Sequence, residues 1–179
     1  VWFAQIRKLN DIIRQTIIKD IRRLPLDIKQ VIEESSGDNV KEIASYLSDK
    51  HSLFILGKGS SESIAKEGSL KIKEIGYIHS EAYSSSALKH GPFSILGDKT
   101  PVILITFNDP NFSKNQGVCE EIKARNSHVI GISDIQLNEK YDQQIIIPKN
   151  ETFRELLATI PMQLIAYYVS INKGMDPDK

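Results

Sequence analysis

The sequence is poor in cysteine, and this limits the chemistry open to it. Its 179 residues include a single cysteine, Cys119. An internal disulfide is therefore impossible, and a structural zinc site would lack its usual companion ligands. Cys119 lies in a helical pattern, which favours a small apolar core residue over a catalytic nucleophile.

The sequence also lacks an excess of charge of either sign. Lys plus Arg number 23 and Asp plus Glu number 23, so no basic surplus attracts nucleic acid or an anionic membrane. The longest apolar runs fall far short of the ~20 residues that span a bilayer, and the first residues show no signal-peptide pattern. We therefore expect a cytoplasmic protein of one-domain size, without nucleic-acid or membrane partners.

Short, wholly apolar segments alternate with amphipathic helical patterns from residue 38 onward. Segments such as LFIL, VILIT and HVIGI are typical of strands buried on both faces of a parallel sheet. Right-handed crossovers then predict a doubly wound α/β domain, with a mainly parallel, five-stranded sheet flanked by helices. The expected strands are 52–56, 78–81, 102–106, 128–132 and 143–147. The expected helices are 40–48, 62–76, a single turn at 85–90, 111–125 and 151–172.

A helical lead-in, residues 1–37, precedes this domain. Residues 3–23 are rich in Ile and Leu mixed with charged residues, and Pro25 is expected to end the first helix. A second amphipathic piece covers 26–34. We expect these helices to connect a preceding domain to the domain at 38–179.

The predicted helix 62–76 carries a cluster of charged side chains at its apolar border. Lys71 lies at this border, with Glu67 and Glu74 at i−4 and i+3. The three side chains can therefore meet at a partly desolvated position. In such surroundings a carboxylate or an amine can acquire a shifted pKa. A pair of ordinary surface salt bridges explains the same spacing and is the more common arrangement. The core-facing arc of the helix consists of Ile64, Ala65, Gly68, Ile72 and Ile75.

A loop of glycine and serine follows the first predicted strand. Gly57 and Gly59 permit close approach of a ligand to the backbone, and Ser60 and Ser61 offer hydroxyl groups where a helix begins. These features suit a phosphate, although the spacing is not that of a P-loop. A tight turn with an N-cap explains the loop equally well.

The run EGSLKIKEIGYIHSEAY, followed by LKHGP, resembles a known family almost word for word. It is similar to the second, C-terminal sugar isomerase (SIS) domain of glutamine:fructose-6-phosphate aminotransferases. The resemblance extends over most of the chain, as far as IPMQLIAYY in the closing helix, and implies a flavodoxin-like fold. It further implies conversion of fructose 6-phosphate and glutamine to glucosamine 6-phosphate and glutamate, without a metal or organic cofactor.

The resemblance also assigns roles to individual residues. Glu74 matches the glutamate that moves a proton between C1 and C2 of the sugar, and Lys71 matches a lysine that stabilises the anionic intermediate. His90 matches a ring-opening histidine that serves the neighbouring subunit, which implies a homodimer. Glu81, with Tyr77 and Tyr83, is expected in the pocket wall.

Two departures from the family limit these expectations. The family's first SIS domain, which holds the sugar phosphate, and its glutaminase domain have no counterpart here, and both are expected as partners. The chain also stops after residue 179, before the family's lysine-bearing catalytic tail, so we expect no synthase activity from the chain alone. A sugar-phosphate-sensing module and a pure dimerisation unit remain the alternative interpretations.

Overall fold

A parallel sheet of five strands organises the chain. The structure, a computed structural model, describes residues 6–7 and 9–178. The strand order is β2-β1-β3-β4-β5, and every neighbouring pair is parallel. The strands are β1 Ser52–Gly57, β2 His79–Ser84, β3 Val102–Ile105, β4 Val129–Ser133 and β5 Gln143–Ile146. The predicted sheet is therefore confirmed, and its order is that of flavodoxin-like folds, with the reversal of strand order between β1 and β3.

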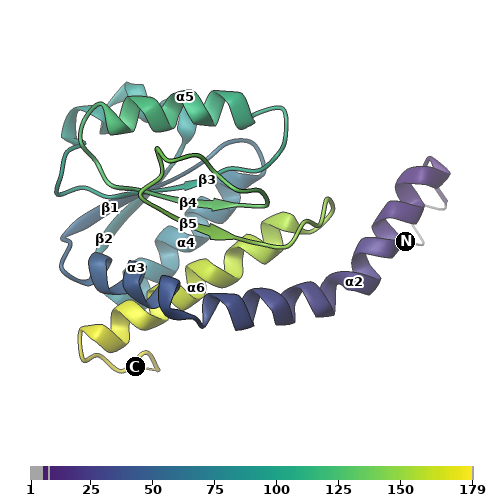
Figure 1. Cartoon of the computed structure of the whole chain (residues 1–179), viewed down its shortest axis with the longest axis horizontal. Helices are drawn as coiled ribbons and strands as arrows, with labels where there is room; N and C mark the ends of the chain where they lie inside the picture. Colours follow the sequence, from purple (N-terminus) through teal and green to yellow (C-terminus); the bar gives the residue numbers. More distant parts are fainter. Residues whose placement is uncertain (1–5, 8, 179) are drawn as a thin grey trace.

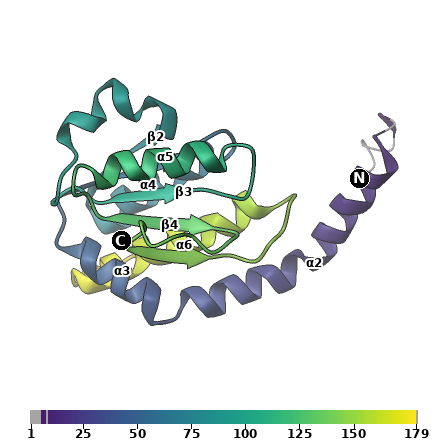
Figure 2. The ribbon, with the colours of Figure 1, turned by 45° about the horizontal axis from the view of Figure 1, so that its top comes forward.

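Helices cover both faces of this sheet (Figure 1). Helix α5 lies on one face, whereas α3, α4 and α6 lie on the other, as a second view also shows (Figure 2). The α-helices are α2 Asp11–Ser35, α3 Asp38–Ser48, α4 Ser61–Gly76, α5 Phe112–Lys123 and α6 Arg154–Asn172. Two 3-10 helices, η1 Ser85–His90 and η2 Pro92–Ile95, follow β2. No helix in the described part of the chain is long and apolar enough to cross a membrane.

Side chains of the inner strands β1, β3 and β4 are divided between two hydrophobic cores. In β1, Leu53 and Ile55 belong to the core under α3, α4 and α6, whereas Phe54 and Leu56 belong to the core under α5. This alternation follows from the two-residue period of a strand. Both sets are buried, which explains why the inner strands β1, β3 and β4 are almost wholly apolar, whereas the edge strands β2 and β5 include polar residues and are only partly buried.

Helix α2 passes through Pro25 without interruption, so the predicted break there is wrong. The proline ring removes one helical hydrogen bond, but tertiary contacts hold the helix on both sides of it. Asp20 accepts hydrogen bonds from Thr152 N (3.1 Å) and Oγ1 (2.6 Å), and Asp27 accepts one from Asn150 Nδ2 (2.9 Å). These buried carboxylates fix α2 against the segment that leads into α6.

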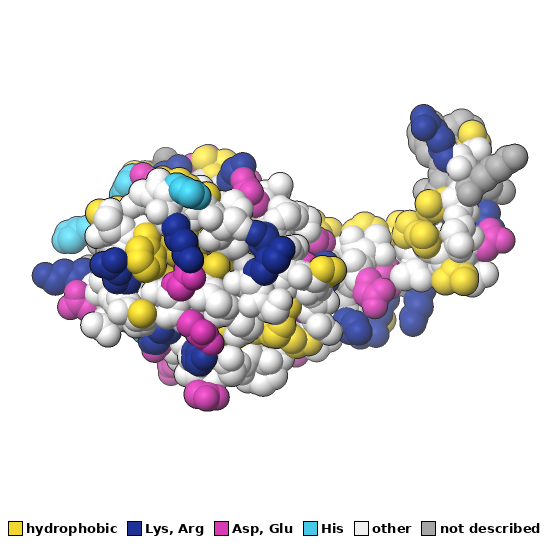
Figure 3. All heavy atoms as spheres, turned by 90° about the horizontal axis from the view of Figure 1, so that it is seen from above, with side chains coloured by type: hydrophobic (Ala, Val, Ile, Leu, Met, Phe, Trp, Pro, Cys, Tyr) yellow, Lys and Arg dark blue, Asp and Glu magenta, His cyan; other side chains and the backbone are white. Residues whose placement is uncertain are grey.

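The start of α2 also differs from the prediction. The predicted helix 3–23 falls partly outside the described residues, and α2 begins only at Asp11. The side chain of Asn10 caps it by accepting a hydrogen bond from Ile12 N at 2.8 Å, because an N-cap oxygen satisfies one of the free amides of the first turn. The N-terminal part of α2 projects away from the sheet and its covering helices (Figures 1 and 2), and it forms an arm beside the body of the molecule in the space-filling view (Figure 3).

Replacing Gly57 with alanine tests the packing at the end of β1. A Cβ at this position would lie 2.4 Å from the carbonyl oxygen of Ser61, and backbone atoms cannot yield as a flexible side chain can. We expect the free energy of unfolding, measured by urea denaturation, to fall by about 2 kcal/mol or more.

Gly117→Ala is the matched control for this substitution. Gly117 lies inside α5 and has no atom within 4 Å of an added Cβ, so alanine should raise the free energy of unfolding by up to about 1 kcal/mol. Wild-type stability in Gly57→Ala would contradict the proposed packing.

Candidate active site

Close packing against α6 and β2 positions helix α4. A Cβ at Gly68 would lie 2.4 Å from Met162 Cε, and one at Gly76 would lie 3.2 Å from Val169 Cγ1. On the sheet side, the buried Ser69 hydroxyl donates to the carbonyl oxygen of Ser80 at 2.8 Å. The rotation of α4 about its own axis is therefore fixed, and with it the direction of the side chains on its outer face.

The outer face of α4 carries the predicted cluster of charges. Lys71 Nζ lies 2.9 Å from Glu74 Oε2 and 3.6 Å from Glu67 Oε1. The hydrogen bond to Glu74 is the main cause that raises the pKa of Lys71, while its slight desolvation acts in the opposite sense. Lys71 is therefore a firmly protonated cation beside two carboxylates.

This cluster is more exposed than the sequence predicts. The side chains of Lys71, Glu67 and Glu74 are 30%, 38% and 49% exposed. The three side chains meet as predicted, but the expected desolvation is wrong for the chain by itself. In the described structure, no other element of the chain covers this face of α4. A closed catalytic cleft around Glu74 requires a further surface.

His90 lies at the end of η1. It is the exposed last residue of η1 and precedes Gly91, whose φ of 142° suits glycine. Its predicted exposure is confirmed. Among the described residues, no hydrogen bond or ion pair joins His90 to Lys71 or Glu74, so only Lys71 and Glu74 of the three predicted catalytic residues are in direct polar contact.

Glu81 lies on β2, which forms one edge of the sheet. The Tyr83 hydroxyl donates a hydrogen bond to Glu81 Oε2, and this bond is the main cause that raises the pKa of Tyr83. His79 Nε2 lies 3.5 Å from the other oxygen of Glu81. Glu81 is therefore already engaged by two neighbours on its own strand.

The glycine-serine loop after β1 is likewise engaged by the chain itself. Gly59 adopts a positive φ of 66°, and the Ser61 side chain is buried at the start of α4. Ser60 Oγ donates to Glu155 Oε1 at 2.6 Å. These contacts favour the tight turn, although Ser60 at the N-cap position makes no side-chain capping bond. A phosphate would have to displace the Glu155 carboxylate from Ser60.

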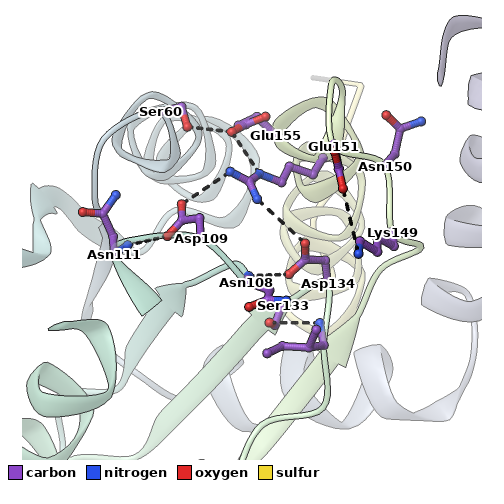
Figure 4. A network of polar contacts seen from close by, with 12 residues as sticks. Ser60, Asn108, Asp109, Asn111, Ser133, Asp134, Lys149, Asn150, Glu151 and Glu155 are labelled. Carbon is purple, nitrogen blue, oxygen red and sulfur yellow. Dashed lines mark hydrogen bonds and ion pairs between the residues drawn. The ribbon is translucent and has the colours of Figure 1, made fainter. Parts of the chain in front are cut away.

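Sequence reasoning missed a network of charges beside this loop. Ser60, Asp109, Asp134 and Glu155 face one another at the carboxyl ends of the strands (Figure 4). Arg154 joins the three carboxylates, with N···O distances of 3.4 Å to Asp109, 3.9 Å to Asp134 and 3.5 Å to Glu155. Three carboxylates around one guanidinium leave this region unfavourable for an anion. Ser60, Asp109, Asp134 and the pair 154–155 are too far apart in the sequence for their spacing to suggest a cluster.

Cys119 is buried in the core under α5, as predicted. Burial of the thiol raises its pKa to about 11. At pH 8 only roughly one thiol in a thousand would be ionised, and the thiolate is the nucleophilic form. Cys119 is therefore unsuited to nucleophilic chemistry in the folded chain.

Thiol labelling tests this conclusion, because the chain has a single cysteine. At pH 8 we expect Ellman's reagent to react with the native protein at least about 100-fold more slowly than with the protein unfolded in urea. Equal rates in the two states would show that Cys119 is accessible and ionised.

The chain is similar to known proteins in both sequence and fold. The sequence profile of the SIS domain matches residues 46–173. A protein of Acanthamoeba polyphaga mimivirus, named as a glutamine–fructose-6-phosphate aminotransferase (isomerizing), is 42% identical over 159 residues, which are 88% of this chain and 26% of the relative. The glutamine–fructose-6-phosphate aminotransferase (isomerizing) of Clostridium tetani is 36% identical over 184 residues, covering 100% of this chain and 30% of the relative.

A solved structure shows the same relationship. The C-terminal domain of glucosamine-fructose-6-phosphate aminotransferase from Francisella tularensis superposes with a TM-score of 0.75 and 32% sequence identity, covering 85% of this chain and 44% of that one. The chain thus spans less than a third of the two curated relatives, at 26% and 30% of their length, and less than half of the solved domain.

Proposed function

Because the chain belongs to the SIS domain family, we propose that it is the second sugar isomerase domain of a glutamine–fructose-6-phosphate aminotransferase. In this role it supplies the groups that isomerise the sugar after nitrogen has been added. The observation that carries the proposal is the Lys71–Glu74 pair, at 2.9 Å on the outer face of a firmly packed helix. The similarity to aminotransferases of this name over at least 88% of the chain supports it.

Glu74 is the base in the proposed reaction. Its carboxylate takes a proton from C1 of the open-chain fructose imine and returns it to C2, while the proton of the C1 hydroxyl passes to the nitrogen, which yields the amino aldose. One carboxylate can serve both carbons because they are neighbours, and a rigid helix keeps it within reach of both. The firmly protonated Lys71 stabilises the negative charge that develops on the sugar oxygen during the transfer.

His90 opens the sugar ring in the active site of a neighbouring subunit. Its exposure at the end of η1, without a hydrogen bond or ion pair to Lys71 or Glu74 among the described residues, fits a residue that acts across a subunit boundary. The proposal therefore includes a homodimer. Glu81 and the loop of Gly57, Gly59, Ser60 and Ser61 are assigned to the periphery of the sugar site, and the engagement of Glu81 and Ser60 by neighbouring side chains makes them its weakest members.

The chain requires a second domain for this reaction. Glu74 is 49% exposed, and a proton shuttle needs a site from which water is excluded. The projecting start of α2 carries Ile12 and Ile13, which are 73% and 50% exposed, and supports the role of residues 1–37 as a connector to a preceding domain. We therefore propose that the first SIS domain and the glutaminase complete the enzyme and that the isolated chain makes no glucosamine 6-phosphate.

Replacing Glu74 with glutamine in the complete enzyme tests the proposed reaction. The amide keeps the size of the side chain but cannot accept the C1 proton, so we expect glucosamine 6-phosphate formation to fall by about 10²–10⁴-fold. Binding of fructose 6-phosphate, measured by calorimetry, and the thermal unfolding midpoint should remain close to those of the wild type.

Glu62→Gln is the matched control, because Glu62 lies on the same helix and forms a solvent-exposed ion pair with Lys66 at 2.8 Å. Its loss should change the rate by less than about twofold. A Glu74→Gln enzyme as active as Glu62→Gln would contradict the catalytic role and favour a sensing or dimerisation module.

A further inference from the structure

The last turn of α4 carries the proposed base. Glu74 lies two residues before the end of the helix at Gly76. The terminal turns of a helix open most readily, because their last carbonyl groups have no donor within the helix. A base that must reach two neighbouring carbons of a substrate needs a fixed position. The end of α4 therefore needs a firm closure if Glu74 is to act from it.

The backbone of α4 does not provide this closure. Its C-cap residue, Tyr77, has a left-handed conformation with φ 50° and ψ 39°, which glycine adopts without strain but a residue with a Cβ does not. At the C-caps of α2, α3, α5 and α6, the backbone N–H donates to a carbonyl oxygen of its own helix. Within the described residues, the N–H of Tyr77 makes no such bond. The carbonyl groups at the end of α4 therefore depend on a donor from another element.

Lys173, the C-cap residue of α6, is this donor. Its Nζ donates hydrogen bonds to the carbonyl oxygen of Gly76 at 2.9 Å and to that of Tyr77 at 3.3 Å. An ammonium group suits this position, because the carbonyl end of a helix carries partial negative charge. A single side chain thus binds two successive carbonyl groups where α4 ends.

The end of α6 holds Lys173 in place. Gly174 follows it with a positive φ of 69°, and the N–H of Gly174 donates to the carbonyl oxygen of Ile171 at 2.9 Å. The N–H of Met175 donates to the carbonyl oxygen of Ser170 at 3.0 Å. These two bonds form a Schellman motif, in which glycine takes the left-handed position without strain. The backbone from which the lysine extends is therefore fixed.

Packing on the same side of α6 supports this contact. Val169 lies four residues before Lys173, which places the two side chains on one face of the helix. Its Cγ1 atom lies 3.2 Å from the position that a Cβ at Gly76 would take. The end of α4 is therefore held by an apolar contact from Val169 and by the hydrogen bonds from Lys173.

We propose that Lys173 is a positioning residue for Glu74. By closing the last turn of α4, it keeps the Glu74 carboxylate beside the ammonium group of Lys71, at 2.9 Å, and within reach of both sugar carbons. Among the described residues, no hydrogen bond or ion pair joins Lys173 to Glu74, so its effect passes through the backbone of α4. This inference rests on the proposed function of Glu74 and adds to it a residue from a different helix.

Replacing Lys173 with methionine in the complete enzyme tests the proposal. Methionine is unbranched and apolar, like the stem of lysine, but it cannot donate to the two carbonyl oxygens. We expect kcat for glucosamine 6-phosphate formation to fall by about 10–100-fold, because the base is less often in its productive position, while KM for fructose 6-phosphate changes by less than about twofold. Lys173→Arg keeps N–H donors at this position and should recover most of the lost rate.

Lys73→Met is the matched control. Lys73 is an exposed lysine in the same last turn of α4, and within the described part of the chain it forms no hydrogen bond or ion pair. Its replacement removes a positive charge from this helix end without removing a donor to the carbonyl groups. We expect its kcat to stay within about twofold of the wild type.

Two further measurements separate positioning from a general loss of stability. In the ¹⁵N-labelled chain, Lys173→Met should speed the hydrogen exchange of amides 74–78 by about tenfold or more, with rates in β1 and β3 unchanged. Adding Gly117→Ala, which lies in α5 on the other face of the sheet, should raise the thermal unfolding midpoint of Lys173→Met without recovering kcat.

Three results would overturn the proposal. They are wild-type kcat in Lys173→Met, equal losses of kcat in Lys173→Met and Lys73→Met, and a loss that disappears when Gly117→Ala restores stability. None of them affects the expected loss of activity in Glu74→Gln. An active Glu74→Gln enzyme would overturn the proposed function and this inference together, so the failure of one can be told from the failure of the other.

Discussion

The close contact between α4 and α6 is the constraint on which the candidate active site depends. At Gly68 and Gly76, α4 packs closely against Met162 and Val169 of α6. At the ends of both helices, Lys173 Nζ donates a hydrogen bond to the carbonyl oxygen of Gly76 at 2.9 Å. A helix held this way has one buried side and one outward side. Lys71 and Glu74 can lie on the outward side only because small residues occupy the other.

The same architecture separates two clusters of charged side chains. The face of α4 carries a lysine between two carboxylates, which suits proton transfer once another domain excludes water. In the network around Arg154, three carboxylates surround one guanidinium and link the segments after β3 and β4 to the start of α6. The formal net charge of the whole chain is zero. The charge of each region therefore depends on which charged side chains lie close together there.

The fold was predictable because its signals are local. Apolar strands of four to six residues and a three- or four-residue helical period specify the sheet and its layers, and the spacing of Lys71 and Glu74 predicts their contact. The features that escaped prediction depend on distant residues. Helix α2 continues through Pro25 because Asn150 and Thr152 hold it, and Ser60 is occupied by Glu155, 95 residues away. In the proposed function, a second domain covers Glu74, and this sequence carries no local signal for such a contact.

A structure of the complete enzyme with fructose 6-phosphate bound would test the central claim most directly. We predict that the outer face of α4 is covered by another domain, with the Glu74 carboxylate within about 3.5 Å of C1 and C2 of the sugar. A sugar bound elsewhere, with Glu74 still facing water, would contradict the account.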